Sequence, residues 1–573
     1  MGRTRILPIA ATALGVIAAA PWWTLSAQGT TSVAVPCDGK SVSSIVINAR
    51  DPSFLAVPRP LRALARGAGL IHTTTKAEVI TRFLLLEVEK PCSELDRSES
   101  ERILRLQPFI AGASVRTVPE TTGTVRVEVE TIDEIPTVFA MHFHGTRPEA
   151  VRFGNGNIGG EALFLATSVE GRRGYRAGMG LQGAAYQAFG KPYTLALDAE
   201  RAPLGGSFSL ALGYPFLTAL QRSAWHAGFS DANRYDDYVR PAGDPLALSV
   251  DRRFWDLGGV RRIAFLRHAA FVGLLLSHEQ VTPADCAVIV SDAGAVVEPT
   301  TLLGGPFAGY RNVRISGVVG TRSLTFVPVR GFDALQSVQD VATGVQLGVL
   351  AGHGVARFGD DDYLISTDVY AGSGSPTSFA AVRFVGETRY DRSNNDWDSA
   401  IGSGRLAWYV KPASAHVLVG SLEFGGGRRA RLPFQLALGD LDGGVRGYSD
   451  SRLAGAVRTV ARLEERWTID ARTQRSAFGL ASFVDAGRVW AGDAPYGVNS
   501  RAKVAVGVGL LAAVPRQSPR VFRLDLAVPV RPDSRARWEI RLSNVYTRVF
   551  WREPGDVARG RAGAAPSTIF GWP

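Results

Sequence analysis

The feature that most constrains the fold of this chain is an alternation of apolar and polar residues that recurs from about Pro136 almost to the end. Segments of roughly ten residues alternate in this way, and glycine, asparagine and aspartate separate them, as in strands joined by turns. Successive side chains of a strand point to opposite faces, so each segment predicts a strand with one apolar and one polar face. The segments that show the pattern best are 504–510, 522–528 and 537–543.

Alternation by itself leaves two architectures open, because a soluble sandwich of two sheets alternates in the same way. The chain has 573 residues, enough for more than one domain. The number of repeats and the signs of export favour a membrane barrel, in which polar side chains line the lumen and aliphatic side chains face lipid. We therefore predict a transmembrane antiparallel β-barrel of about 16 strands at residues 137–553. Residues 230–251 and 280–309 are expected to be long extracellular loops.

The N-terminus has the three parts of a secretory signal peptide, which we place at residues 1–27. Arg3 and Arg5 provide the basic region, and residues 6–20 are apolar and rich in alanine. A single helical membrane anchor is the alternative, but the apolar stretch is short and ends at Pro21. The net charge of +11 would suggest a nucleic-acid partner, but export argues against one. Lumen-facing arginines are ordinary in outer-membrane barrels and account for a basic chain.

Residues 37–136 have a different pattern, which predicts a small domain built from helices and strands. The expected elements are a strand at 42–47, helices that begin with capping boxes at 75–78 and 96–99, and strands at 113–118 and 124–131. The last of these strands is the candidate for an open sheet edge. Between the first strand and the first helix, residues 61–66 form a possible short amphipathic helix.

Two of the three cysteines fall in this N-terminal domain, namely Cys37 and Cys92, whereas Cys286 lies far along the chain. An exported domain lies in an oxidising compartment, where a disulfide between Cys37 and Cys92 is plausible. Two unpaired thiols are the alternative, and the sequence leaves both open.

Two short motifs near the C-terminal end carry the candidate site. One is Val445-Arg446-Gly447-Tyr448, in a glycine-rich loop, and the other is Phe483-Val484-Asp485-Ala486-Gly487, in a strand-like segment. An arginine in a loop pairs with an aspartate on a membrane strand only where lipid is excluded, so the loop is predicted to lie inside the barrel.

The strand between the two motifs supplies a second carboxylate, because Glu464 shares its polar face with three arginines. We predict that Arg446 bridges Asp485 and Glu464, and that Phe483 packs against Tyr448. Glycine in the loop allows a close approach to the wall. The predicted lumenal site residues are Val445, Arg446, Gly447, Tyr448, Glu464, Phe483, Asp485 and Gly487.

These motifs resemble those of the BamA/TamA superfamily of outer-membrane insertases and protein translocators. The N-terminal pattern resembles a polypeptide-transport-associated (POTRA) domain, mainly through residues 101–109 and 125–130. Better-known insertases of the superfamily carry several such domains, whereas the length available here holds one. The resemblance implies a protein of the cell outer membrane in a Gram-negative-type envelope, with its N-terminal domain in the periplasm.

The resemblance also implies a function. The POTRA-like domain would capture an unfolded outer-membrane or secreted client protein, and the barrel would assist insertion or passage of this client. It would do so by thinning the bilayer or by opening a seam between its first and last strands. The implied partners are the client and outer-membrane lipid, with no nucleic acid; the sequence does not identify accessory proteins.

Two other functions stay open, a two-partner secretion pore and a passive porin-like structural barrel. The chain has no phosphate-binding loop, no nucleophile elbow and no zinc-ligand spacing. We therefore expect no enzyme activity, no cofactor and no metal. The C-terminal tail at 554–573 is rich in glycine, alanine and arginine, and we expect it to be disordered or tucked under the barrel.

Overall fold

The structure is a computed structural model, and the statements below concern the residues that it describes. These are 35–52, 73–144, 147–170, 178–218, 220–242, 245–265, 268–290, 296–301, 307, 309–431, 434–439, 443–449, 451–469, 475–531, 538–547 and 550–561. The predicted signal peptide at 1–27 and the possible helix at 61–66 lie outside them. None of the described helices is long and apolar enough to cross a membrane.

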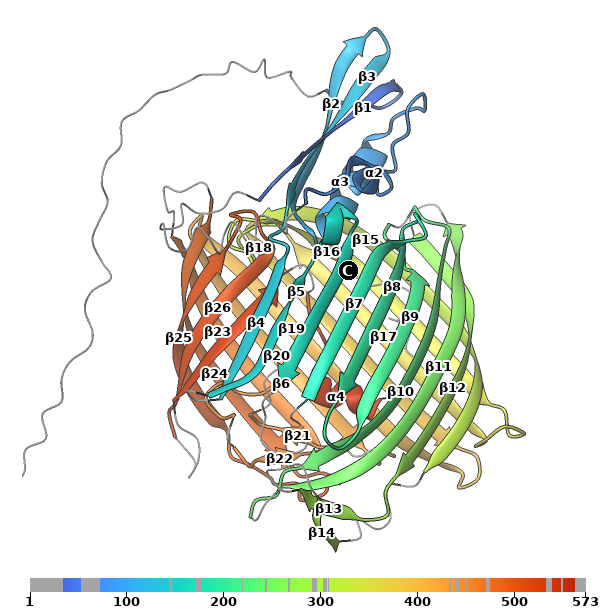
Figure 1. The fold of residues 1–573 in the computed structure, drawn as a ribbon, viewed down its shortest axis with the longest axis vertical. Coiled ribbons are helices and arrows are strands. Elements are labelled where there is room, and N and C mark those ends of the chain that lie inside the picture. Colours follow the sequence, from blue (N-terminus) through green and yellow to red (C-terminus); the bar gives the residue numbers. More distant parts are fainter. Residues whose placement is uncertain are drawn as a thin grey trace, which may run out of the picture.

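A closed antiparallel barrel forms the body of the molecule (Figure 1). Twenty strands form its wall within the described residues: β4 (Thr137–His144), β5 (Arg147–Asn155), β6 (Leu163–Glu170), β7 (Gly178–Ala188), β8 (Tyr193–Arg201), β9 (Gly206–Tyr214), β10 (Ser223–Tyr238), β11 (Leu246–Phe265), β12 (His268–Pro283), β15 (Tyr310–Arg330), β16 (Val338–Gly354), β17 (Asp362–Gly374), β18 (Ser378–Asp391), β19 (Asp396–Ala413), β20 (His416–Arg428), β23 (Val457–Ile469), β24 (Ala477–Trp490), β25 (Lys503–Ala513), β26 (Arg520–Pro529) and β27 (Glu539–Tyr546). A short hairpin of β13 (Ala287–Val290) and β14 (Val296–Thr301) projects beside it, because β12 pairs directly with β15.

The prediction of about sixteen strands is wrong, and the two expected long loops explain part of the difference. β10 and β11 pair through most of residues 230–251, and the hairpin of β13 and β14 lies within 280–309. Polar residues such as Asp231 and Arg234 occur on both faces where β10 reaches the end of the barrel. Alternation is lost there, so a paired strand has the composition of a loop.

The predicted alternation in the last strands is confirmed. Along β24, Leu480 and Val484 are exposed on the outer face, whereas Phe483 and Asp485 are buried on the inner face. Neighbouring strands continue the exposed aliphatic surface through the cross-strand pairs Val506–Val528, Val508–Leu526 and Leu510–Leu524. The barrel therefore has an aliphatic exterior and a polar interior on this side.

The N-terminal domain has the predicted order of elements: β1 (Ser41–Arg50), α2 (Ala77–Thr81), α3 (Glu94–Leu106), β2 (Ile110–Thr121) and β3 (Thr124–Asp133). Helix α3 begins earlier than expected, with Ser93 as its N-cap, and the hydroxyl of Thr75 donates to Asp133 instead of capping α2. Both helices pack on the sheet around a core that includes Ile80, Leu104 and Val127. Cys37 and Cys92 form the predicted disulfide.

The prediction that residues 124–131 form the open edge is wrong. The sheet order is β1-β3-β2, so β3 is the central strand, parallel to β1 and antiparallel to β2. The local sequence of a strand after a tight turn is the same whether the strand lies at the edge or in the centre of a sheet. Its position depends on how the connection through the helices places β1, which the local sequence does not specify. The edges are therefore β1 and β2.

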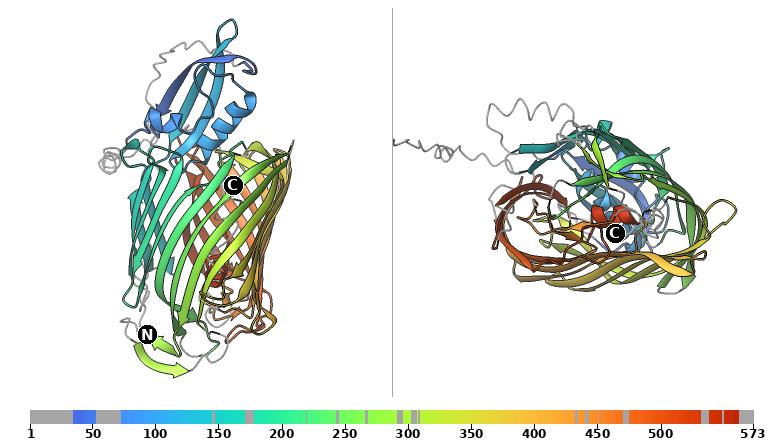
Figure 2. Two further views of the ribbon diagram at one scale, coloured as in Figure 1. Left: turned by 90° about the vertical axis from the view of Figure 1, so that its right-hand side faces the viewer. Right: turned by 90° about the horizontal axis from the view of Figure 1, so that it is seen from below.

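The N-terminal domain lies over one mouth of the barrel, as Figures 1 and 2 show. Arg105 of α3 forms a bidentate pair with Asp340, near the start of β16, at 2.7 and 2.9 Å. A second contact joins the turn before β26 to the segment between β3 and β4, where the hydroxyl of Ser518 donates to Glu134 at 2.6 Å. These buried polar contacts fix the domain on the mouth.

The prediction for the C-terminal tail is also wrong for the part that the structure describes. After β27 ends at Tyr546, the chain turns back into the lumen, and residues 555–560 form α4 (Gly555–Gly560) inside the barrel (Figure 2). Contacts with several wall strands hold this segment. Residues 562–573 lie outside the described part of the chain.

Candidate functional site: the lumenal loop

The predicted site lies on a loop that enters the barrel between β20 and β23. A two-residue ladder of β21 (Leu436–Ala437) and β22 (Ala454–Gly455) closes its base. Within the loop, Val445 and Tyr448 are fully buried in an apolar cluster with Leu438 and wall residues of β23, β24 and β25. Burial against the inner wall fixes the loop inside the lumen, as the sequence predicts.

Arg446 is the centre of the site, and the structure brings it to both predicted carboxylates. Its Nε and Nη2 each donate to one oxygen of Asp485 at 2.7 Å, which is a bidentate pair. Its Nη1 lies 3.4 Å from Glu464. Burial by itself lowers the pKa of Arg446, but the hydrogen bond and the charge of Asp485, with the neighbouring carboxylates, raise it, so the guanidinium stays charged.

The ring of Phe483 packs against the guanidinium of Arg446. The guanidinium carbon of Arg446 lies 3.4 Å from the centre of the Phe483 ring, which is cation–π geometry. We expected Tyr448 against Phe483, but Tyr448 belongs to the separate apolar cluster, and its hydroxyl donates to the backbone carbonyls of Val504 and Arg531. Two neighbouring residues thus hold the loop: Arg446 through its ion pairs and its contact with Phe483, and Tyr448 through its buried ring.

Sequence reasoning missed three members of the site, which come from β26 and β27. Asp525 accepts from Arg446 at 3.0 Å. Arg523 donates to both oxygens of Glu464 at 2.7 Å, so Arg523 is a closer partner of Glu464 than Arg446 is. Glu539 accepts from the backbone N–H of the loop residue Gly447 at 2.6 Å. The signal for all three was the charged face of segments 522–528 and 537–543.

Two glycines in the motifs have identifiable structural reasons. Gly447 has φ +85°, a conformation that glycine adopts without strain. Gly487 faces the loop, and a Cβ there would lie 2.4 Å from Cγ2 of Val445. Both positions therefore require glycine for the loop to pack on the wall.

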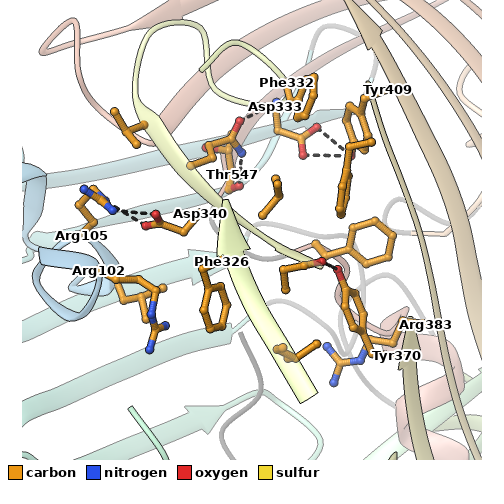
Figure 3. Close-up of a pocket in the computed structure, with 18 of the residues that line it drawn as sticks. Arg102, Arg105, Phe326, Phe332, Asp333, Asp340, Tyr370, Arg383, Tyr409 and Thr547 are labelled. Atoms are coloured by element: carbon orange, nitrogen blue, oxygen red, sulfur yellow. Dashed lines mark hydrogen bonds and ion pairs between the residues drawn. The ribbon is translucent and has the colours of Figure 1, made fainter. Parts of the chain in front are cut away.

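Where α3 meets the barrel mouth, a small cavity lies between the N-terminal domain and the lumen (Figure 3). Arg102 stacks over the ring of Phe326, with 4.1 Å between its guanidinium carbon and the ring centre. The cavity volume of about 60 Å³ holds a few waters and no polypeptide segment. The N-terminal domain and the barrel are therefore in close contact where α3 meets the mouth.

A larger cleft opens beside this contact, between the N-terminal sheet and the turns of the barrel mouth. Its volume is about 980 Å³. The charged residues that line it are Arg50, Arg105, Arg116, Arg330 and Lys411, with Glu101 and Glu130. The cleft is thus basic and faces the end of the molecule that carries the N-terminal domain.

The described residues contain no group of three or more histidine, cysteine, aspartate or glutamate side chains placed to hold a metal ion. The acidic run at 360–362 is engaged by arginines: Asp360 by Arg431, Asp361 by Arg392 and Asp362 by Arg314.

No family model and no curated protein matches this chain. Among solved structures, the chain is similar to BamA from Haemophilus ducreyi lacking POTRA domains 1–3, at 12% identity over 88% of this chain and 84% of that one, with a TM-score of 0.34. It is also similar to CdiB from Escherichia coli, at 12% identity over 91% and 92% with a TM-score of 0.43. It is similar as well to CdiB from Acinetobacter baumannii, at 14% identity over 88% of this chain and 73% of that one, with a TM-score of 0.37. All three TM-scores lie below 0.5, and we draw no conclusion from these likenesses.

Proposed function

We propose that this protein is an outer-membrane insertase or translocator of the type that its motifs resemble, with a POTRA-like domain that captures unfolded clients. The observation that carries the proposal is the combination of a closed barrel, whose lumen contains its own loop and tail segment, with a small domain at its mouth whose strand β1 has an unpaired edge within the described residues. The proposal involves no covalent chemistry and no cofactor.

The closed wall and its aliphatic exterior support a place in a membrane. Every strand of a closed barrel pairs on both sides, so no backbone edge meets lipid. The signal peptide predicted from the sequence, taken with the β-barrel, supports our proposal of an outer-membrane location with the N-terminal domain on the periplasmic side.

The capture step uses the edge of β1. Within the described residues, the outer edge of β1 from residue 44 to residue 50 makes no backbone hydrogen bond. The outer edge of β2 is engaged, because the N–H of Val35 donates to Thr117, and side chains of α3 bond both backbone groups of Val115. An extended client segment adds to an unpaired edge through main-chain hydrogen bonds, which need no particular client sequence.

The edge of β1 leads toward the barrel. Its last residue, Arg50, lines the basic cleft at the mouth. Five basic and two acidic side chains line this cleft, which favours client segments that carry aspartate or glutamate.

The insertion step uses the seam between β27 and β4, which is closed in this structure. These two strands have eight residues each, whereas β15 has 21. Opening this seam breaks fewer backbone hydrogen bonds than separating two long strands, and a client strand would pair with the exposed edges. A passive porin is disfavoured, because the loop and the tail occupy its lumen.

The capture step is tested by placing a photo-crosslinking amino acid at Val46, an exposed residue of β1, and adding a urea-unfolded model barrel protein to the purified full chain in liposomes. We expect a crosslinked product between the two proteins. Leu95 on α3 is the matched control, since it is also apolar and exposed but lies away from the edge of β1. Equal crosslinking at Val46 and Leu95, or none at Val46, would contradict capture by this edge.

A further inference from the structure

We infer that residues 550–561 are an internal plug, which closes the lumen and opens a conducting path when it leaves. The inference goes beyond the proposed function, since it requires only that the barrel spans a membrane. It concerns the segment that follows the last wall strand.

The segment enters the lumen from the mouth that carries the N-terminal domain. The ring of Phe550 packs edge-on against Tyr370, at 5.8 Å between ring centres. The side chain of Arg405 donates to the carbonyl of Phe550 at 3.0 Å. These contacts hold the start of the segment against β17 and β19.

Helix α4 is anchored deeper in the lumen by an ion pair and an apolar contact. Arg458 of β23 donates to both oxygens of Asp556, and both side chains are less than 5% exposed. Beside this pair, Val557 is fully buried against Ile401 and Leu436. The wall residue Gly425 makes room, since a Cβ there would lie 3.1 Å from Val557.

The end of the described segment reaches across the lumen to a distant part of the wall. Arg252 of β11 donates to the carbonyls of Arg559 and Arg561, at 3.2 and 2.6 Å. Seven strands lie between β11 and β23 in the ring. A segment held by both strands therefore crosses the lumen, which is the geometry of a plug.

The plug also supports the lumenal loop. Arg458, which holds Asp556, donates to the carbonyl of Ala437 at the base of the loop, at 2.7 Å. The loop residue Gly443 packs against Arg458 and Pro554 so closely that a Cβ would lie 2.2 Å from the arginine. Release of the plug therefore removes one support of the loop.

The contacts of the plug suit reversible release. Most are ion pairs and hydrogen bonds to lumenal side chains, which water replaces at lower cost than it replaces a dry apolar interface. Residues 550–561 contribute no strand to the wall among the described residues, so the segment leaves the lumen without unpairing any described wall strand.

The test is ion conductance in planar bilayers, with the full chain beside a chain that ends at residue 549 and beside Arg458→Asp, Asp556→Arg and the double charge swap. We expect the wild type to be closed for most of the time. The shortened chain should raise the open fraction about 100-fold or more because it lacks the plug. Both single variants should do the same, because each leaves one partner of a buried pair without its counter-charge. The charge swap should return the open fraction toward the wild-type value.

Arg357→Asp, in an exposed turn, is the control for the charge change. Heat-modifiable electrophoretic mobility verifies that each variant is a folded barrel before its conductance is read. Equal conductance of the wild type and the shortened chain would overturn the plug, as would single variants that stay closed. Neither result depends on client insertion, so failure of the plug is distinct from failure of the proposed function.

Discussion

Replacement of Arg446 by alanine is expected to lower the free energy of unfolding of the barrel by about 3–5 kcal/mol, because the substitution leaves buried carboxylates without their partner. Asp485 is affected most, since its two short contacts are both to Arg446 and its other cationic neighbour, Arg462, lies at 3.9 Å. Glu464 and Asp525 keep Arg523. The measurement is the urea concentration at which the folded band of heat-modifiable electrophoresis is lost.

Two further variants separate the ion pair from general damage. Arg446→Lys keeps the charge but loses the bidentate geometry, so its midpoint should lie between those of the wild type and Arg446→Ala. Asp485→Asn, added to Arg446→Ala, removes the uncompensated charge and should restore part of the loss. If Arg446→Ala lowered the midpoint no more than Arg357→Ala in an exposed turn, the buried cluster would not hold the loop.

Removal of the disulfide is expected to destabilise the N-terminal domain by about 4 kcal/mol by the chain-entropy relation. The bond joins residues 55 apart in the sequence and links the segment before β1 to the start of α3. The Cys37→Ser/Cys92→Ser variant should therefore show faster hydrogen exchange at the buried central strand, for example at Val127 and Val129, by about 100-fold or more.

The control for this prediction is Cys286→Ser, since Cys286 is a free cysteine in the described residues. Its exchange rates in β3 should equal those of the wild type. Unchanged exchange at Val127 and Val129 in the double serine variant would show that the sheet and helices hold the domain without the bond.

Local patterns predicted those features that depend on neighbouring residues. The alternation in β24 placed Phe483 and Asp485 on the inner face, and Glu464 followed from the polar face of β23. The order of elements in the N-terminal domain followed from β-branched runs and polar helix starts. Each of these signals spans a few residues, so one sequence is enough to read it.

The features that were missed depend on contacts between distant residues. The central place of β3 results from a parallel pairing with β1 that no local signal specifies. The tail has the composition of a disordered segment, yet Arg561 is held by Arg252, 309 positions away. Such polar pairings stabilise a segment only when the closed wall brings them together, which is why composition misjudged the tail.

The most direct test of the central claim is the rate at which a urea-unfolded model barrel protein assembles into liposomes that contain this protein. The proposal predicts faster assembly than in empty liposomes of the same lipid, and predicts that Arg446→Ala, at a temperature where its own barrel is still folded, loses most of the acceleration. Assembly at the same rate with the wild-type protein as in empty liposomes would contradict an insertase function.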